Sequence, residues 1–309
     1  MWRFDNLDPQ VGMFFEKELT SVQEDVYKKD KPPKNGFDEL PQYTQDPEWS
    51  QEIEIRMWDT AGLAEFMADY ASDLPLVSLQ TEKDQYPVRA FGAAYQYSKD
   101  EIQKASENNL DLERKKGLAA REVIERRQNR IMWFGAPVVG LFGLLNYPHI
   151  PRRQIAVKFN QNNNANTIRK ELNSFINSVF DIVEGDEGLA PTKILMPPNP
   201  YTHIAGEPWN GDASGAATDT TILTHFMRNN PFVETVEPVR ELKGAGPNGE
   251  DVMVAMRPDK DRQAHRAVKP FTQEDPERRN LAWRVNTWAK SGGFVSQFPL
   301  EMAIGEFPA

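Results

Sequence analysis

The chain has 309 residues, of which 39% are hydrophobic and 27% charged, and its formal net charge is −10. This length and apolar content exclude a disordered chain and allow a sizeable core, in one large or two closely associated domains. The negative charge argues against indiscriminate binding to nucleic-acid phosphates, and the lack of cysteine excludes disulfides, thiolate metal sites and thiol nucleophiles.

The first 50 residues predict an extended arm. They carry eleven acidic and six basic side chains and several prolines. Such a segment cannot bury enough apolar surface to fold alone, although it carries Phe14, Phe15 and Trp49 among other large apolar groups. We expect the arm to be ordered by lying on a neighbouring subunit; composition alone fits a disordered tail equally well.

Residues 51–97 predict an extended excursion. Ile53, Ile55 and Met57 alternate with charged residues, which is typical of a half-buried strand. A short helix is expected over Leu63–Tyr70, followed by extended chain with a tip or bend at Gln80–Gln85. Next, Ser98-Lys99-Asp100-Glu101 predicts the capping box of another helix.

A long charged helix is predicted from about Asn109 to Phe134. Asn109 can cap its start, and Gly135 and then Pro137 stop it. The residues from Asp111 onward would reach roughly 36 Å, so this helix must be held along its length. Its expected apolar stripe is Leu118, Ala120, Val123, Ile124, Ile131 and Phe134. The glycine-rich exit Gly140–Asn146 follows.

The second half predicts alternating helices and strands. We expect, in chain order, an amphipathic helix through Ile168–Val179, a buried strand Lys193–Met196, an exposed loop Gly206–Gly215, a helix Thr218–Met227, strands Phe232–Leu242 and Asp251–Met256 around the hairpin-like turn Gly244–Gly249, and two closing strands through Trp283–Trp288 and Phe294.

The motif Trp58-Asp59-Thr60-Ala61-Gly62 reproduces a small-GTPase signature, but its context excludes a nucleotide site. A GTPase also needs a glycine-rich phosphate loop ending in Gly-Lys-Ser/Thr and a guanine-reading Asn-Lys-x-Asp, and neither occurs. We interpret Asp59 or Thr60 as the end of a strand and the cap of a helix.

No pattern for catalysis or metal binding is recognised. The four histidines lack a metal-ligand partner at helical spacing, and the common catalytic fingerprints are absent. Acidic pairs are expected by chance among 46 acidic residues. We therefore expect no enzyme activity, no cofactor and no metal, and keep open an enzyme acting on a polar substrate near Asp212.

The order and character of these elements resemble those of tailed-bacteriophage major capsid proteins. An acidic aromatic arm, a two-stranded excursion, a long charged helix, Trp-Phe-Gly followed by Gly-Leu-Leu-Asn, a compact α/β segment and a returning sheet occur in the same order. The resemblance implies an α+β chain with the Hong Kong-type capsid fold, which encapsulins share.

On this resemblance the chain divides into four parts. Residues 1–50 form an N-terminal arm and 51–97 an extended loop; 98–150 and 270–309 form a peripheral domain whose spine helix spans about 110–134, and 151–269 form an axial domain. Some family members crosslink a loop lysine to an asparagine. Lys83 is the only lysine between Gln51 and Ser98, but no motif fixes its partner, so we expect no crosslink.

The resemblance implies a major capsid protein that self-assembles as hexamers and pentamers into an icosahedral phage head enclosing double-stranded DNA. The implied partners are the chain itself and portal, scaffold and possibly decoration proteins, with no membrane and no sequence-specific DNA contact. We expect synthesis in the host cytoplasm and residence in the virion. The predicted inter-subunit contacts are Phe14, Phe15, Trp49, Arg56, Lys83, Arg89, Arg126, Arg127, Arg130 and Asp212. The alternative is an encapsulin-like shell around protein cargo, which the long arm disfavours.

Overall fold

The computed structural model describes residues 32–61, 78–102, 112–186, 188–209, 220–280 and 282–308. Within them, Lys34–Ala309 form one compact unit. The described helices are α2 (Gly36–Glu39), α4 (Leu112–Phe134), α5 (Ala165–Ile182), α6 (Pro198–Gly206) and α7 (Ile222–Asn229), with single 3-10 turns η1 (Pro137–Val139), η2 (Leu144–Asn146), η3 (Arg240–Leu242) and η4 (Pro299–Glu301).

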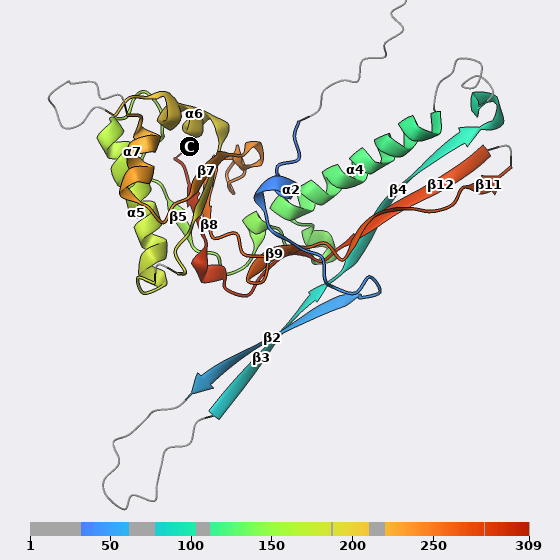
Figure 1. Ribbon diagram of the computed structural model, residues 1–309, viewed down its shortest axis with the longest axis horizontal. Coiled ribbons are helices and arrows are strands. Elements are labelled where there is room, and N and C mark those ends of the chain that lie inside the picture. Colours follow the sequence, from blue (N-terminus) through green and yellow to red (C-terminus); the bar gives the residue numbers. More distant parts are fainter. Residues whose placement is uncertain are drawn as a thin grey trace, which may run out of the picture. The chain divides into compact units, whose positions relative to one another are not determined.

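The described strands fall into four sheets (Figure 1). Their bounds are β1 (Gln42–Tyr43), β2 (Glu52–Ala61), β3 (Ser78–Pro87), β4 (Arg89–Ser98), β5 (Arg152–Gln154), β6 (Lys193–Met196), β7 (Thr235–Pro238), β8 (Val252–Met256), β9 (Gln263–Arg266), β10 (Lys269–Gln273), β11 (Glu277–Arg279), β12 (Ala282–Ser291), β13 (Gly293–Ser296) and β14 (Ala303–Glu306).

A five-stranded sheet in the order β5-β14-β8-β6-β7 organises the largest core. The strand β8, Val-Met-Val-Ala-Met, is buried throughout, as expected for a central strand covered on both faces. One set of its side chains, with those of β6, packs against Ile168, Leu172 and Phe175 of α5 and Phe226 of α7.

The other face of this sheet is covered by the end of the long helix. Leu195, Val254 and Ile304 pack in one cluster with Met132 and Trp133 of α4. Burial of these aliphatic and aromatic groups is the main favourable term in joining the two halves of the chain. The long helix therefore ends inside the core of its neighbouring sheet.

The predicted hairpin between the strands flanking Gly244–Gly249 is wrong. The strand β6 lies between β7 and β8, pairing parallel with the first and antiparallel with the second. The first strand is also shorter than predicted, because β7 ends at Pro238 and the chain continues into the turn η3. The connection spans one intervening strand and so is no hairpin.

The last strand crosses the predicted boundary at Pro270. β14 pairs antiparallel with β8 and parallel with β5, so Ala303–Glu306 belong to the same sheet as the segment assigned to the axial domain. The partners of this short strand could not be predicted from the sequence pattern, because pairing between distant segments leaves no local signal.

The long helix α4 packs on a second sheet. β4 pairs with β12 over ten residues in unbroken antiparallel register, and β10 and β11 pair with the other edge of β12. Alternate residues of β12, including Val285, Thr287 and Ala289, are buried. This alternation is the period of a sheet with one covered face. The two predicted closing strands, β12 and β13, are confirmed.

The predicted helix is confirmed over Leu112–Phe134, whereas its expected cap Asn109 lies outside the described residues. The prediction of its apolar stripe is half right. Ala120, Ile124 and Ile131 are buried, but Leu118, Val123 and Phe134 are exposed. The covered face is narrow and includes the polar side chains Gln128 and Asn129, which the hydrophobic pattern could not identify.

Other local predictions are confirmed. Ser98 and Glu101 form the capping box, each backbone N–H donating to the other side chain at 3.1 Å. The predicted amphipathic helix through Ile168–Val179 is α5, and the predicted strand Lys193–Met196 is β6. The helix α6 was not predicted, because Pro198 and Pro200 suggested a break; prolines are tolerated in a first helical turn.

Candidate assembly surfaces

The ribbon formed by β2 and β3 is largely exposed. Ten residue pairs run in register from Glu52–Pro87 to Ala61–Ser78. Near its base Ile53 packs with Val88 and Val268, whereas the first eight residues of β3 are exposed. The predicted alternation of Ile53 and its successors is confirmed.

The predicted tip at Gln80–Gln85 is wrong, because these residues lie inside the strand β3. Their polarity reflects exposure on both faces of the ribbon, since a strand needs apolar residues only where a face is covered. The residues that join the two strands, with the predicted helix Leu63–Tyr70, lie outside the described part of the chain.

The exit of the long helix is a joint in which backbone packs on backbone. Gly135 has φ +64°, and a Cβ at Gly143 would overlap the backbone of Trp133 at 2.7 Å. The amide of Gly143 donates to Asn146 Oδ1 at 2.6 Å, and Phe294 N donates to Phe142 O at 2.7 Å. The predicted stop at Gly135 is confirmed, and glycines there permit the close approach.

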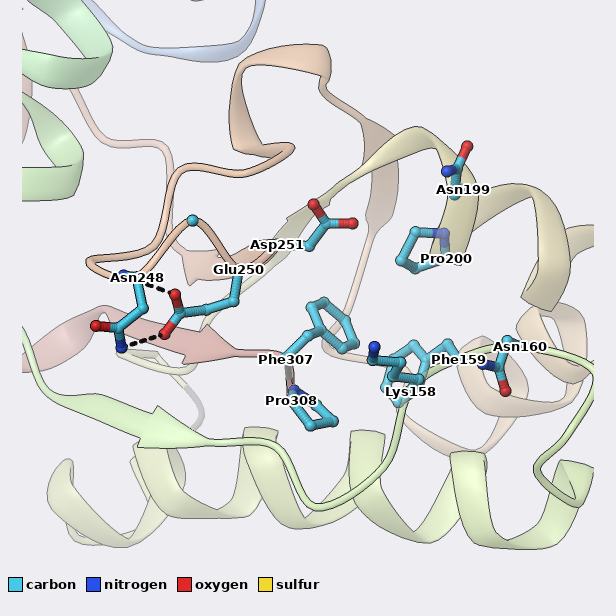
Figure 2. A pocket seen from close by; sticks show the side chains of 11 residues that line it. Lys158, Phe159, Asn160, Asn199, Pro200, Asn248, Glu250, Asp251, Phe307 and Pro308 are labelled. Atoms are coloured by element: carbon cyan, nitrogen blue, oxygen red, sulfur yellow. Dashed lines mark hydrogen bonds between the residues drawn. The ribbon is translucent and has the colours of Figure 1, made fainter.

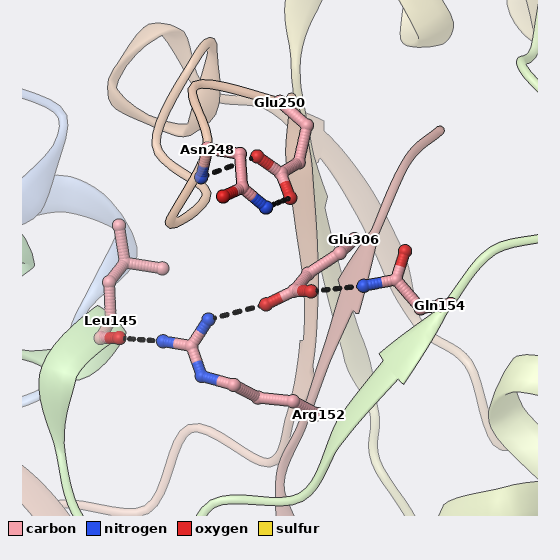
Figure 3. Close-up of polar contacts among 6 residues, drawn as sticks. All are labelled: Leu145, Arg152, Gln154, Asn248, Glu250 and Glu306. Atoms are coloured by element: carbon pink, nitrogen blue, oxygen red, sulfur yellow. Dashed lines mark hydrogen bonds and ion pairs between the residues drawn. The ribbon is translucent and has the colours of Figure 1, made fainter. Parts of the chain in front are cut away.

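A polar bridge ties this exit to the five-stranded sheet (Figure 3). Arg152 on β5 donates to the Leu145 carbonyl and to Glu306 Oε1, the latter at 2.7 Å. Gln154 donates to the other oxygen of Glu306, whose side chain is only 8% exposed. The buried carboxylate is thus satisfied by two donors, as such groups require.

A second bridge anchors the start of the described chain. Gly36 N donates to Asn129 Oδ1 at 2.7 Å, while Asn35 and Asn129 both donate to the carboxylate of Glu241 at 3.1 and 2.9 Å. A Cβ at Gly36 would lie 2.8 Å from Met132 Sδ. Because these contacts join three segments far apart in sequence, no sequence signal identified them.

The predicted contact residues of the arm and loops are only partly described. Phe14, Phe15 and Asp212 lie outside the described residues. Trp49 is 80% exposed. On the ribbon, Arg56 pairs with Glu54 at 2.5 Å, and Lys83, directly opposite Arg56, is exposed.

The predicted basic contacts on and near α4 are largely at the surface. Arg89 donates to the Val139 carbonyl at 3.2 Å, so it reaches the helix exit. Arg126 pairs with Glu122 at 3.2 Å, and Arg127 and Arg130 are exposed. The structure therefore leaves these cations largely accessible to a neighbour, and it spreads the seven described residues of the ten over the ribbon, the helix exit and α4.

Histidine 265 is the one strongly perturbed histidine in the described part of the chain. It is fully buried, with Nε2 3.4 Å from both Gln128 Nε2 and Ser291 Oγ. Burial lowers its pKa to about 3. No group of three or more His, Asp or Glu side chains in the described ranges could hold a metal ion.

A polar cavity of about 470 Å³ lies beside Phe307 and Pro308 (Figure 2). Its acidic groups are engaged in local turns: Glu250 accepts from Asn248 N at 2.7 Å, and Asp251 accepts from Gly244 N at 2.8 Å. Lys158 and Asn199 complete a polar lining without a nucleophile and base in contact.

None of the described helices is long and apolar enough to cross a bilayer.

Solved structures share this architecture. The capsid of Myoviridae phage XM1 matches 94% of this chain and 98% of its own, with a TM-score of 0.81 at 15% identity. The SrpI encapsulin from Synechococcus elongatus matches 95% of this chain and 94% of its own, with a TM-score of 0.59 at 11% identity. These likenesses confirm the expected Hong Kong-type capsid fold.

No curated protein sequence matches the chain. The family model described as "Major capsid protein" matches residues 62–304, which is most of the chain. Membership of this family makes the protein a structural component of a virion that associates with itself into a shell, and it overrides the alternative of an enzyme near Asp212. The chain belongs to the major capsid protein family.

Proposed function

We propose that this chain assembles as hexamers and pentamers into the icosahedral head of a tailed bacteriophage and encloses double-stranded DNA. The β2–β3 ribbon carries this proposal. Among the described residues its two ten-residue strands pair only with each other, and most side chains of β3 are exposed. Because an isolated two-stranded ribbon is marginally stable in water, neighbouring copies are needed to cover it.

Each part of the chain has a role in this assembly. Within residues 1–50 and 51–97, the arm and the β2–β3 ribbon of the extended loop reach neighbouring subunits, while Leu40, β1 and β4 pack within their own chain. Residues 98–150 and 270–302 form the peripheral domain. Residues 151–269, joined by β14, form the axial domain whose loops meet around the hexamer or pentamer axis. Many modest interfaces then become stable through closure and repetition.

The enclosed DNA is held without sequence-specific contacts. A chain of net charge −10 suits dense packing of DNA that must later leave. Portal and scaffold proteins, and possibly a decoration protein, complete the head, and the chain is made in the host cytoplasm. Arg126, Arg127 and Arg130 are the first positions at which assembly defects are expected on substitution.

Size-exclusion chromatography and negative-stain microscopy of the purified chain test the proposal. Closed shells or hexameric and pentameric capsomers are expected. A stable monomer that never assembles, even with its phage partners, would contradict it. Nuclease digestion of particles from infected cells then identifies protected DNA as the content.

The second candidate is an encapsulin-like compartment enclosing protein, favoured by the SrpI encapsulin match over 95% of this chain. That match has a lower TM-score than the phage XM1 capsid, 0.59 against 0.81. Mass spectrometry of purified particles distinguishes the two. A stoichiometric cargo protein without nucleic acid would favour the compartment.

A further inference from the structure

A cleft of about 530 Å³ lies beside the middle of α4. The segment after α2 forms one side, and the start of β10 forms the other. Phe37, Val268, Pro270 and Phe271 supply apolar walls. The other lining residues are mostly polar or charged, so the cleft suits a bulky side chain that has both an apolar body and a hydrogen-bonding group.

One carboxylate oxygen in the cleft accepts no hydrogen bond from the described residues. Asp46 Oδ2 is buried and accepts no hydrogen bond within the described residues, and its side chain is 13% exposed. The nearest cation is Arg266, with Nη1 at 3.8 Å, and its guanidinium lies 4.0 Å from the ring centre of Tyr43. Burial raises the pKa of the Asp46 carboxyl, and Arg266 only partly opposes this. A hydrogen-bond donor entering the cleft would remove this cost.

The ribbon carries a side chain with matching chemistry. Trp58 is 77% exposed, and Leu79, diagonally across on the same face, is 58% exposed. An indole has a large apolar body and one N–H donor, which suits apolar walls with one free acceptor. Arg56 lies on the same face two residues earlier, where it can meet the exposed Glu48 at the rim of the cleft.

Trp58 does not fill the cleft of its own chain. Ile53, at the base of the ribbon, packs against Val268, which lines the cleft. Trp58 lies five residues farther along the strand, or about 17 Å at the rise of an extended chain. The exposure of the Trp58 side chain confirms that it does not occupy this cleft within its own chain.

We propose that Trp58 of one copy inserts into this cleft of a second copy, donating its indole N–H to Asp46 and placing Leu79 against the apolar rim. The proposal rests on the proposed function, because it requires copies to stand side by side. A buried tryptophan anchor surrounded by weaker contacts is the usual form of an interface hot spot.

The absence of native cysteine allows a direct test by disulfide trapping. Trp58→Cys and Thr44→Cys chains are purified separately, mixed before assembly and oxidised. Thr44 is an exposed residue that lines the cleft. We expect covalent dimers of the two variants in assembled shells. Val138→Cys, at a residue that is 99% exposed, replaces Trp58→Cys in the control and should give few dimers.

Three outcomes separate this contact from the proposed function. Normal shells without the dimer between positions 58 and 44 would overturn the contact alone. So would preferential trapping of Thr44→Cys by Phe14→Cys, because the arm would then occupy the cleft. Failure of the unsubstituted chain to assemble at all would count against the proposed function, and the contact would fall with it.

A second measurement does not depend on disulfide geometry. Trp58→Ala should raise the concentration needed for assembly by roughly tenfold or more, and Trp58→Phe by less, because it keeps the apolar body and loses the donor. Leu300→Ala removes a comparably exposed apolar group at η4 and should leave assembly unchanged. Equal effects of the tryptophan and leucine substitutions would contradict the contact.

Discussion

The five-stranded sheet and the β2–β3 ribbon are built from strands of similar regularity but bury very different fractions of their side chains. Every residue of β8 is buried, whereas the first eight of β3 are exposed. A strand covered on both faces gains stability from packing within its own chain. The ribbon gains little stability from such packing, so its ordered form depends on the surface that covers it.

The largest expected loss of stability comes from a substitution in the core of the five-stranded sheet. Phe175→Ala should lower the free energy of unfolding by about 3 to 5 kcal/mol, because the side chain is fully buried between α5 and the sheet. Urea unfolding of the unassembled subunit measures it. Phe298→Ala, at a side chain that is 42% exposed, should cost far less; similar losses would show that the core is placed wrongly.

Truncation locates the start of the folded unit. Leu40 belongs to the buried core, and β1 pairs with β9. Removing residues 1–45 should therefore destabilise the subunit by at least the roughly 2 to 5 kcal/mol of one buried leucine, relative to removing residues 1–31. Thermal melting compares the two. Equal melting temperatures would place Leu40 outside the core.

The bridge at Glu306 should contribute less. Arg152→Ala removes one of two donors to a buried carboxylate, and we expect a loss of about 1 to 3 kcal/mol. Glu306→Gln in the same background should recover part of it, since the remaining group is uncharged. A double-mutant cycle in urea measures the coupling; additive losses would show that the pair does not interact.

His265 should make the stability depend on pH. Its folded-state pKa, about 3, lies below its ordinary value of 6.5, so the unfolded chain binds more protons between these values. The contribution of neutral His265 to the free energy of unfolding is therefore fully present above pH 6.5. Below that pH the free energy of unfolding falls by up to about 1.4 kcal/mol per pH unit. His265→Gln should flatten this dependence in urea unfolding between pH 4 and 7. If the pH dependence of the unfolding free energy were unchanged in this variant, it would have to come from carboxyl groups instead of His265.

The smallest effect is expected on the ribbon. Leu79→Ser should change the stability of the unassembled subunit by no more than about 0.5 kcal/mol, because the side chain is 58% exposed. Urea unfolding measures it before assembly. A loss of several kcal/mol would show that the ribbon is covered within its own chain, and the comparison with the sheet would fail.

Local chemistry predicted most elements, and long-range pairing explains the errors. The capping box at Ser98 and the stop at Gly135 depend on neighbours in sequence and are confirmed. The order of β6, β7 and β8, the return of β14 and the buried Asn129 depend on segments far apart. A one-dimensional pattern does not contain these contacts, since periodicity reports which face is covered and not what covers it.

The candidate surfaces show the same limit. Trp49, Arg127 and Arg130, which were predicted as inter-subunit contacts, are exposed, whereas Trp58 was interpreted only as part of the GTPase-like motif. The cleft that contains Asp46 combines three segments, 37–48, 121–128 and 267–271. Recognition of such a site requires the fold, because no segment alone carries a pattern that indicates a binding site.

The glycine joint after α4 has a mechanical consequence. Where Gly135, Gly143 and Gly293 bring backbone against backbone, there are no side chains whose rotamers could absorb a twist. We expect torque applied far along the 23-residue helix to be delivered to β13 through the bond from Phe294 N to Phe142 O, and to the five-stranded sheet through the bond from Arg152 to the Leu145 carbonyl. A shell built from such subunits would convert a small rotation at one contact into a concerted turn of the whole subunit.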